Sequence, residues 1–352
     1  MGARGTGTGP ITLRDVARAA DTTPMTVSNV VNGRAGQVSE AMARRVLDAC
    51  DRLGYRPNAA ARGLRTNRRE AIGVVIVDPS PHYVSDPLTA AMLAGLDARL
   101  GRSGYSTVLR GVPHADLASV SLLRAIETDA IALILSGGAD ERARVLERMA
   151  ATRQPLLFIQ DEAPDDLADA AAVLLDDRGG ALALARHLSE RGPSRVVFLA
   201  PALAWSAMAR REAGLRAGLP GVRVDVVTCA DEGFDATEAA LRAHVDTHGW
   251  PDAVVGGNDQ MAIAGMKLAI ASGRSVPADV AFAGFNGLDF WRYATPELTT
   301  VRAPAYALGE AAGDALLARL DGAVFVDRRR VLPVELRVHA SSGARSGPVV
   351  PD

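Results

Sequence analysis

Hydroxyl and amide side chains are concentrated near the N-terminus, in a stretch from Thr23 to Asn29 that also contains a valine. An asparagine amide can pair through two hydrogen bonds with N6 and N7 of adenine. Threonine and serine hydroxyls commonly donate hydrogen bonds to phosphate oxygens. The stretch therefore carries residue types that suit contact with duplex DNA. They can act together only if one face of a helix displays them while the opposite face is buried.

The spacing of apolar residues predicts that such helices form. Three short helices are expected, with the boundaries Thr12–Ala20, Thr23–Val31 and Ser39–Gly54. Thr23 is a good N-cap and Pro24 suits the first helical position. The buried side of this second helix is then formed by Val27, Val30 and Val31. Two helices joined by a tight turn, followed by a third helix, indicate a helix-turn-helix unit.

Motifs of the common enzyme classes do not occur in the sequence. No GxGxxG fingerprint follows the first predicted strand, and the sequence contains neither a P-loop nor a nucleophile elbow. The two cysteines, Cys50 and Cys229, are far apart, and neither has a cysteine or histidine at the spacing of a metal site. We therefore expect no enzymatic activity, no cofactor, no metal, and two reduced thiols.

Positive charge is concentrated in the first fifth of the chain. Residues 1–70 contain twelve arginines against six acidic residues, whereas the remainder contains 27 basic and 35 acidic residues. This asymmetry indicates that the N-terminal part, and not the rest, contacts a polyanion. Residues 1–10 lack the apolar segment of a secretory signal, and no run of about 18 apolar residues predicts a membrane span. We expect a cytoplasmic protein.

Beyond residue 70 the apolar residues form continuous runs, which are typical of strands buried on both faces. Such strands are predicted at 72–77, 130–135, 156–159, 196–199, 253–255 and 280–283. Amphipathic helices are predicted between them, at 87–100, 180–190, 207–217 and 261–271. Alternating strands and helices form parallel, doubly wound sheets, and this number of strands favours two subdomains.

Together these segments resemble the lactose-repressor (LacI/GalR) family of bacterial transcription regulators. The likeness is carried by TLRDVARAA, TVSNVVNG, VSEAMARRVLDACDRLGYRPN, AARGLRT, GGNDQMAIAGMKLAIASGRSVPADVAFAGFN and TPELTTVRAP. It extends from Ile11 to about Ala340. The resemblance implies a repressor that binds a palindromic operator in double-stranded DNA as a homodimer, with an affinity that a small-molecule effector changes.

The resemblance also implies the domain order. We expect a disordered tail (1–10), an all-α helix-turn-helix domain (11–57), a hinge helix with linker (58–70), an effector-binding and dimerisation domain (71–340), and a second tail (341–352). The domain 71–340 should be a periplasmic-binding-protein-like α/β sensor of two doubly wound parallel-sheet subdomains. Their expected ranges are 71–172 with 300–325, and 173–298 with 326–340. The helix at 87–100 is expected in the dimer interface.

By resemblance, the base-reading positions are Pro24, Met25 and Asn29. The family commonly has arginine, which suits guanine, at the third position, so the asparagine predicts an A·T pair there; the alternative is that Asn29 touches only phosphate. In the family the hinge helix enters the minor groove, where Leu64 would insert between base steps; the alternative is a flexible linker. Further expected DNA contacts are Thr12, Thr23, Thr26, Ser28, Asn32, Arg34, Tyr55, Asn58 and Ala61.

Ligands of such folds bind between the subdomains, beside the carboxyl ends of the strands. The effector-binding residues expected there by resemblance are Leu88, Gln160, Arg211, Phe234, Asn258 and Asn286. Gln160 and Asn286 stand where aspartate is usual in the family. With two carboxylates fewer, the positive charge of Arg211 should be less neutralised. We therefore expect the effector to be a sugar derivative that is anionic or carries fewer hydroxyl groups. Asp161 and Glu162 are acids that would restore this charge. The alternative is a regulator of the same fold that acts through a protein partner or DNA alone.

Overall fold

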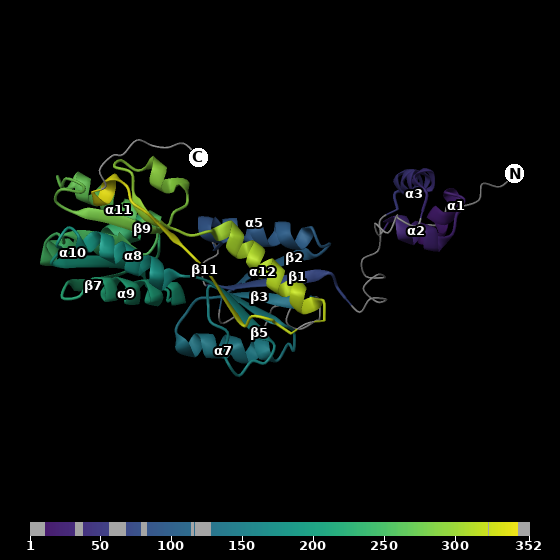
Figure 1. The fold of residues 1–352 in the computed structure, drawn as a ribbon, viewed down its shortest axis with the longest axis horizontal. Coiled ribbons are helices and arrows are strands. Elements are labelled where there is room, and N and C mark those ends of the chain that lie inside the picture. Colours follow the sequence, from purple (N-terminus) through teal and green to yellow (C-terminus); the bar gives the residue numbers. More distant parts are fainter. Residues whose placement is uncertain are drawn as a thin grey trace. The chain divides into compact units, whose positions relative to one another are not determined.

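The computed structural model of this 352-residue chain describes residues 11–31, 38–55, 68–78, 83–113, 116, 128–322 and 324–343. The chain divides into two compact units, Met1–Arg69 and Glu70–Asp352 (Figure 1). Among the described residues, no helix is long and apolar enough to cross a membrane.

The first unit contains the three predicted helices, α1 (Leu13–Ala19), α2 (Pro24–Val31) and α3 (Glu40–Leu53). Side chains at the helix starts accept the otherwise unpaired backbone N–H groups: Thr23 Oγ1 accepts from Thr26 N at 3.1 Å and Ser39 Oγ from Met42 N at 3.4 Å. Gly54 ends α3 in the left-handed conformation with φ 65°. Local sequence signals therefore set these boundaries.

A small apolar core holds the three helices together. Its fully buried members come from all three helices: Val16, Ala17, Ala20, Val27, Val30, Val46, Ala49 and Cys50. Arg45 Nη2 also donates to the carbonyl oxygen of Ala20 at 2.7 Å, which joins α3 to the end of α1. The valine face of α2 is thus the buried face, as predicted.

The second unit contains two six-stranded sheets in the described part of the chain. The first sheet has the order β11-β5-β4-β3-β1-β2 and the second the order β12-β10-β9-β8-β6-β7. All neighbouring strands are parallel except β10 and β12. The six predicted strands are β1, β3, β4, β6, β8 and β9. The first-sheet strands are β1 (Ala71–Val77), β2 (Ser106–Val112), β3 (Ala130–Leu135), β4 (Leu156–Ile159), β5 (Ala170–Leu175) and β11 (Arg329–Leu332).

The second sheet lies in the other subdomain. Its strands are β6 (Arg195–Pro201), β7 (Arg223–Cys229), β8 (Ala253–Gly256), β9 (Ala281–Asn286), β10 (Thr299–Arg302) and β12 (Glu335–Arg337). Short 3-10 helices form at η2 (Tyr83–Ser85), η4 (Asp289–Tyr293) and η5 (Ala340–Ser342). The carboxyl ends of the parallel strands are the edges where a ligand is expected.

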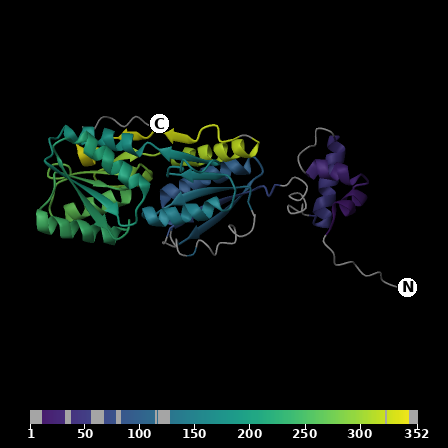
Figure 2. The same ribbon diagram turned by 90° about the horizontal axis from the view of Figure 1, so that it is seen from below.

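Helices cover both faces of each sheet (Figure 2). In the first subdomain, α5 (Pro87–Gly101) and α12 (Ala305–Leu320) pack on one face and α7 (Ala139–Ala150) on the other. In the second, α8 (Asp177–Ser189) and α9 (Ser206–Gly218) pack on one face, and α10 (Phe234–His248) and α11 (Asp259–Ala271) on the other. This layering explains the continuous apolar runs, because the central strands are buried on both sides.

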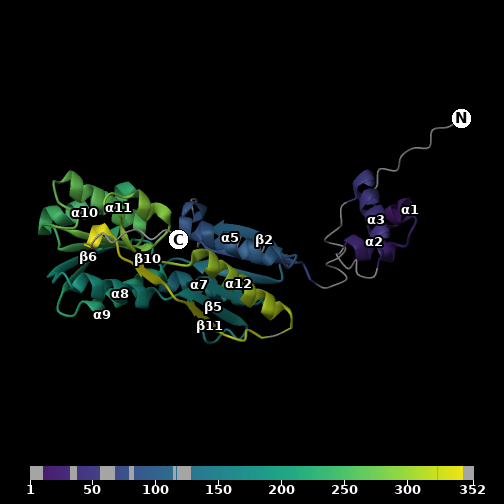
Figure 3. The same ribbon diagram turned by 45° about the horizontal axis from the view of Figure 1, so that its top comes forward.

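The chain crosses between the subdomains three times, and all three predicted boundaries need correction. The expected break at 172/173 falls inside β5, which belongs to the first sheet throughout. Strand β10 pairs with β9 of the second sheet, although residues from 300 were assigned to the first subdomain. Strand β11 pairs with β5 of the first sheet, although residues from 326 were assigned to the second (Figure 3). Burial patterns predict a strand but not which sheet it joins.

The predicted C-terminal tail begins too early. Ser341 and Ser342 are buried, and Ser341 Oγ donates to the carbonyl oxygen of Phe282 at 2.6 Å. Ser341 Oγ also accepts from Thr299 N at 2.8 Å, which fastens the segment to β10. Two short polar residues were expected to be solvated, yet these hydroxyls satisfy backbone groups of the second sheet. Residues 344–352 lie outside the described residues.

Helices α5 and α12 lie side by side at close range (Figure 1). A Cβ on Gly309 of α12 would overlap the carbonyl oxygen of Met92 in α5. Near the C-terminal end of α5, Arg99 Nε contacts Asp314 Oδ1 of α12 at 2.5 Å and Arg102 Nη2 contacts Glu310 Oε1 of α12 at 2.9 Å. Because glycine at position 309 has no side chain, the backbones of α5 and α12 can approach each other closely.

Gly309→Ala is expected to destabilise the second unit by about 1–3 kcal/mol, because the added methyl group forces α5 and α12 apart. Chemical denaturation measures the change. The control is Gly101→Ala, since a Cβ at Gly101 meets no atom within 4 Å. It should leave stability unchanged or raise it by up to about 1 kcal/mol. Equal effects of the two substitutions would contradict the close contact.

Candidate DNA-reading surface and effector site

The face of α2 opposite its valines is open to solvent. Met25 is 68% exposed and Pro24 is also exposed, while Thr26 and Asn29 are half-buried. Ser28 is only 8% exposed, so the prediction that it faces outward is wrong. On a helix, residue 28 is adjacent to 27 and three residues from 31, which places it beside the buried stripe. Three base-reading candidates remain on one accessible surface.

Several other predicted DNA contacts also have structural partners. Thr12 Oγ1 donates to Asp15 Oδ2 at 2.6 Å, and Thr23 Oγ1 caps α2. Tyr55 is half-buried and packs against the core of the first unit. The remaining candidates, Asn32, Arg34, Asn58, Ala61 and Leu64, lie outside the described residues. Their DNA contacts stay predictions.

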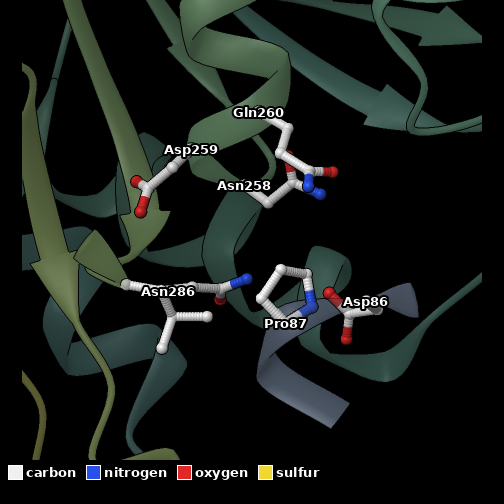
Figure 4. A pocket seen from close by; sticks show the side chains of 7 residues that line it. Asp86, Pro87, Asn258, Asp259, Gln260 and Asn286 are labelled. Carbon is white, nitrogen blue, oxygen red and sulfur yellow. The ribbon is translucent and has the colours of Figure 1, made fainter. Parts of the chain in front are cut away.

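In the second unit a pocket lies between the subdomains (Figure 4). Its walls come from the start of α5, the start of α11 and the turn after β9. The lining residues are Asp86, Pro87, Asn258, Asp259, Gln260, Asn286 and Leu288. Two of the six predicted effector residues, Asn258 and Asn286, line it.

Asn258 caps α11 and also contacts an acid that sequence reasoning missed. Its Oδ1 accepts from Met261 N at 2.9 Å, and its Nδ2 donates to Glu232 Oε2 at 2.7 Å. Burial, together with the negative charges of Asp86 and Asp78, raises the pKa of Glu232 from 4.5 to about 7, although Arg211 and the hydrogen bond from Asn258 act in the opposite direction. Glu232 follows β7 at the carboxyl edge of the second sheet. This position after a strand is the feature of the sequence that could have indicated a residue near the ligand.

Asp259 holds the pocket wall in place. Its carboxylate is almost fully buried and accepts hydrogen bonds from Thr300 Oγ1 at 2.5 Å and Gly287 N at 2.8 Å. Burial raises the pKa of Asp259 to about 7, although these hydrogen bonds act in the opposite direction. The turn after β9, where Asn286 adopts φ 97°, is thereby tied to the start of α11.

Arg211 lies behind the pocket and is 2% exposed. Its Nε donates to Asp177 Oδ1 at 2.8 Å, its Nη1 to the carbonyl oxygen of Gly257 at 2.5 Å, and its Nη2 to Asn286 Oδ1 at 3.2 Å. The expectation that Arg211 is less neutralised is therefore wrong, because Asp177 compensates its charge. The argument for an anionic effector loses its premise.

The two acids expected to restore charge near the effector are engaged elsewhere. Asp161 pairs with Arg142 and accepts from Ser206 Oγ at 2.7 Å. Glu162 pairs with Arg329 at 3.0 Å. Neither lines the pocket.

Three predicted effector residues lie away from the pocket. Gln160 adopts φ 64°, and its Oε1 accepts from Leu175 N at 3.0 Å. Leu88 packs against the core of the first sheet. Phe234 is the first residue of α10, 37% exposed, and its ring lies 4.7 Å from the ammonium of Lys267. The sequence located the correct edges of the sheets but not the directions of these side chains.

Two family models match the sequence. The model for "Bacterial regulatory proteins, lacI family" matches residues 12–58, and the model for "Periplasmic binding protein-like domain" matches residues 185–342. The HTH-type transcriptional regulator CelR of Thermobifida fusca is 29% identical over 342 residues, which cover 94% of this chain and 98% of CelR. The HTH-type transcriptional repressor PurR of Vibrio atlanticus is 28% identical over 316 residues, covering 88% and 92%.

Solved structures agree over nearly the whole chain. The lac repressor dimer bound to operator and the anti-inducer ONPF gives a TM-score of 0.80 at 25% identity, covering 96% of this chain and 100% of that one. The CelR–cellobiose complex gives a TM-score of 0.67 at 27% identity, covering 94% and 99%.

A helix-turn-helix unit followed by a two-subdomain ligand-binding domain defines a class of ligand-responsive, DNA-binding transcription regulators. Within that class, this chain belongs to the LacI family of bacterial regulatory proteins. The predicted fold class and family are confirmed.

Glu232→Gln is expected to stabilise the chain more near pH 8 than near pH 5.5. Because the pKa of Glu232 rises from 4.5 to about 7 on folding, the folded state binds this proton more tightly than the unfolded state. Stability is therefore lost as the pH rises through about 7, and the uncharged glutamine removes that loss. Urea denaturation at the two pH values measures the effect.

The control is Glu238→Gln, which removes a carboxylate paired with Arg242 on α10. It should change the free energy of unfolding by no more than about 0.5 kcal/mol at either pH. A Glu232→Gln effect of equal size at both pH values would contradict the raised pKa.

Proposed function

We propose that this chain is a sequence-specific transcription repressor that binds a palindromic operator as a homodimer. A small molecule between the subdomains of the second unit changes its operator affinity. The observation that carries the proposal is the combination of an accessible face on α2, which includes Asn29, with a pocket lined by both subdomains in one chain. This combination suits regulation rather than catalysis, and we propose that the protein acts on DNA in the cytoplasm.

The relatives support both parts of this proposal. The lac repressor is a dimer on its operator in the solved complex, and CelR is solved with cellobiose. Two copies of α2 related by a two-fold axis would read two half-sites of a palindrome. We extend this to the hinge at 58–70, where Leu64 would insert into the minor groove, and to an effector that is sugar-like.

Contacts between the subdomains offer a route by which the effector changes the dimer. Arg210 Nη2 of α9 donates to the carbonyl oxygen of Gln160 at 2.9 Å, and Gly137 N donates to the carbonyl oxygen of Ala204 at 2.8 Å. A ligand that prefers one arrangement of the subdomains shifts the population toward it. The resulting coupling between effector and operator is typically about 1–3 kcal/mol.

The test of the proposal is selection of operator fragments by the full-length protein. Purified protein is mixed with fragmented genomic DNA at physiological salt, and the retained fragments are sequenced. We expect enrichment of fragments that share a palindrome, with half-site centres about one helical turn apart. Retention equal to that of random duplex would overturn the proposal.

Asn29→Ala is expected to remove discrimination at one symmetric base pair of the operator. The asparagine amide suits adenine, so the substitution should cost about 1–3 kcal/mol on the A·T operator and little on a G·C variant. The comparison is Thr26→Ala, which removes an expected phosphate contact and should weaken both operators equally. Titrations by fluorescence anisotropy measure the six affinities of the unsubstituted protein and the two variants for the two operators. If the unsubstituted protein binds both operators alike, Asn29 does not read that base.

A further inference from the structure

We propose that the effector of this chain carries a protonated amine next to hydroxyl groups, as amino sugars and aminocyclitols do. The inference rests on the proposed function, because it concerns the ligand of the same pocket. Three features carry it: carboxylates at the pocket, the absence of a free arginine beside them among the described residues, and an amide donor aimed into the empty space.

The carboxylates come from both subdomains. Asp86 caps α5 at the pocket wall, where its Oδ2 accepts from Thr89 N at 2.8 Å and from Thr89 Oγ1 at 2.7 Å. Its other oxygen, Oδ1, accepts no hydrogen bond from the described residues. Glu232 lies behind Asn258, near enough to Asp86 and Asp78 for their charges to oppose its ionisation. Negative charge therefore accumulates at this place.

The nearby arginines are already committed. Arg211 contacts Asp177, Gly257 and Asn286, and its guanidinium also lies 4.6 Å from the centre of the Phe285 ring. Arg210 binds the second oxygen of Asp177 at 3.1 Å. The positive charge of Arg211 lowers the pKa of Glu232. Burial and the charges of the two aspartates raise that pKa by more, so it stays above its usual value. A cationic ligand would compensate the negative charge that these carboxylates place near the pocket.

Asn286 gives a second, independent indication of a ligand. Its side-chain oxygen accepts from Arg211, so its Nδ2 is left as a donor, and it donates to none of the described residues. The residue is only 8% exposed, and Figure 4 shows its amide directed toward Pro87 and Asp86 across the pocket. A ligand oxygen in the pocket would give this donor a partner.

These groups together select one ligand chemistry. The amide donor suits a hydroxyl oxygen, and the carboxylates suit an ammonium group, which donates three hydrogen bonds. An anion would be repelled by Asp86 and Glu232. A neutral sugar would leave Oδ1 of Asp86 without a cationic partner. An amine beside hydroxyls satisfies both parts of the pocket.

The experiment compares matched ligands on the full-length protein. Sets of an amino sugar, its parent sugar and its N-acetylated form, in the gluco, galacto and manno series, are screened by thermal shift and then by calorimetry. We expect at least one amino sugar to bind about tenfold or more tightly than both of its analogues, as a charge-assisted hydrogen bond predicts. Putrescine, which has amines but no hydroxyls, should bind more weakly.

Two substitutions complete the test. Glu232→Gln keeps an acceptor for Asn258 but should remove the preference for the amine, whereas Glu238→Gln should retain it. The proposal is overturned if no amine binds, if parent sugars or putrescine bind as tightly, or if Glu232→Gln keeps the preference. Operator retention measured on the same preparation separates the outcomes: a protein that binds operator but rejects amines disproves only the ligand class.

Discussion

The buried ion pair between Asp177 and Arg211 determines the geometry of the effector pocket. Both residues are almost fully buried, where an unpaired charge is very costly, and removing one partner of such a pair typically costs about 3–5 kcal/mol. With its charge compensated, Arg211 reaches the carbonyl oxygen of Gly257 and the side chain of Asn286. It thereby fixes the turns that precede α11 and follow β9. The pocket walls consequently depend on a carboxylate that does not line the pocket.

The same carboxylate connects the pocket with the subdomain boundary. Its Oδ1 holds Arg211, and its Oδ2 holds Arg210, whose Nη2 reaches the carbonyl oxygen of Gln160 in the first subdomain. A ligand that moves Asn286 changes the environment of Arg211, and through Asp177 that of Arg210. One hydrogen-bonded group therefore links the pocket wall with the subdomain boundary.

The sequence predicted those features that depend on neighbouring residues. Thr23 and Pro24 open α2, and Gly54 ends α3, because capping and φ requirements are local. The sheet to which β10 or β11 belongs was assigned wrongly, since pairing with β9 or β5 joins residues far apart in the chain. The predicted directions of side chains were wrong for the same reason, because they depend on residues far away in the chain. Phe234 was expected at the ligand, yet it turns to Lys267, while Glu232, two residues earlier, contacts Asn258.

The charge of the pocket shows why comparing single positions with a family pattern misleads. Amides at 160 and 286, where aspartate is usual, suggested that negative charge had been lost around Arg211. In the folded chain Asp177, 34 residues earlier, supplies that charge, and Glu232 with Asp86 adds more from other elements. A ligand experiences the summed charge of all groups near the pocket, and buried ion pairs contribute little to that sum because their charges compensate each other. Complementarity must therefore be argued from the groups that can still bind a ligand, here Oδ1 of Asp86, the carboxylate of Glu232 and the amide donor of Asn286, and not from the most conspicuous arginine.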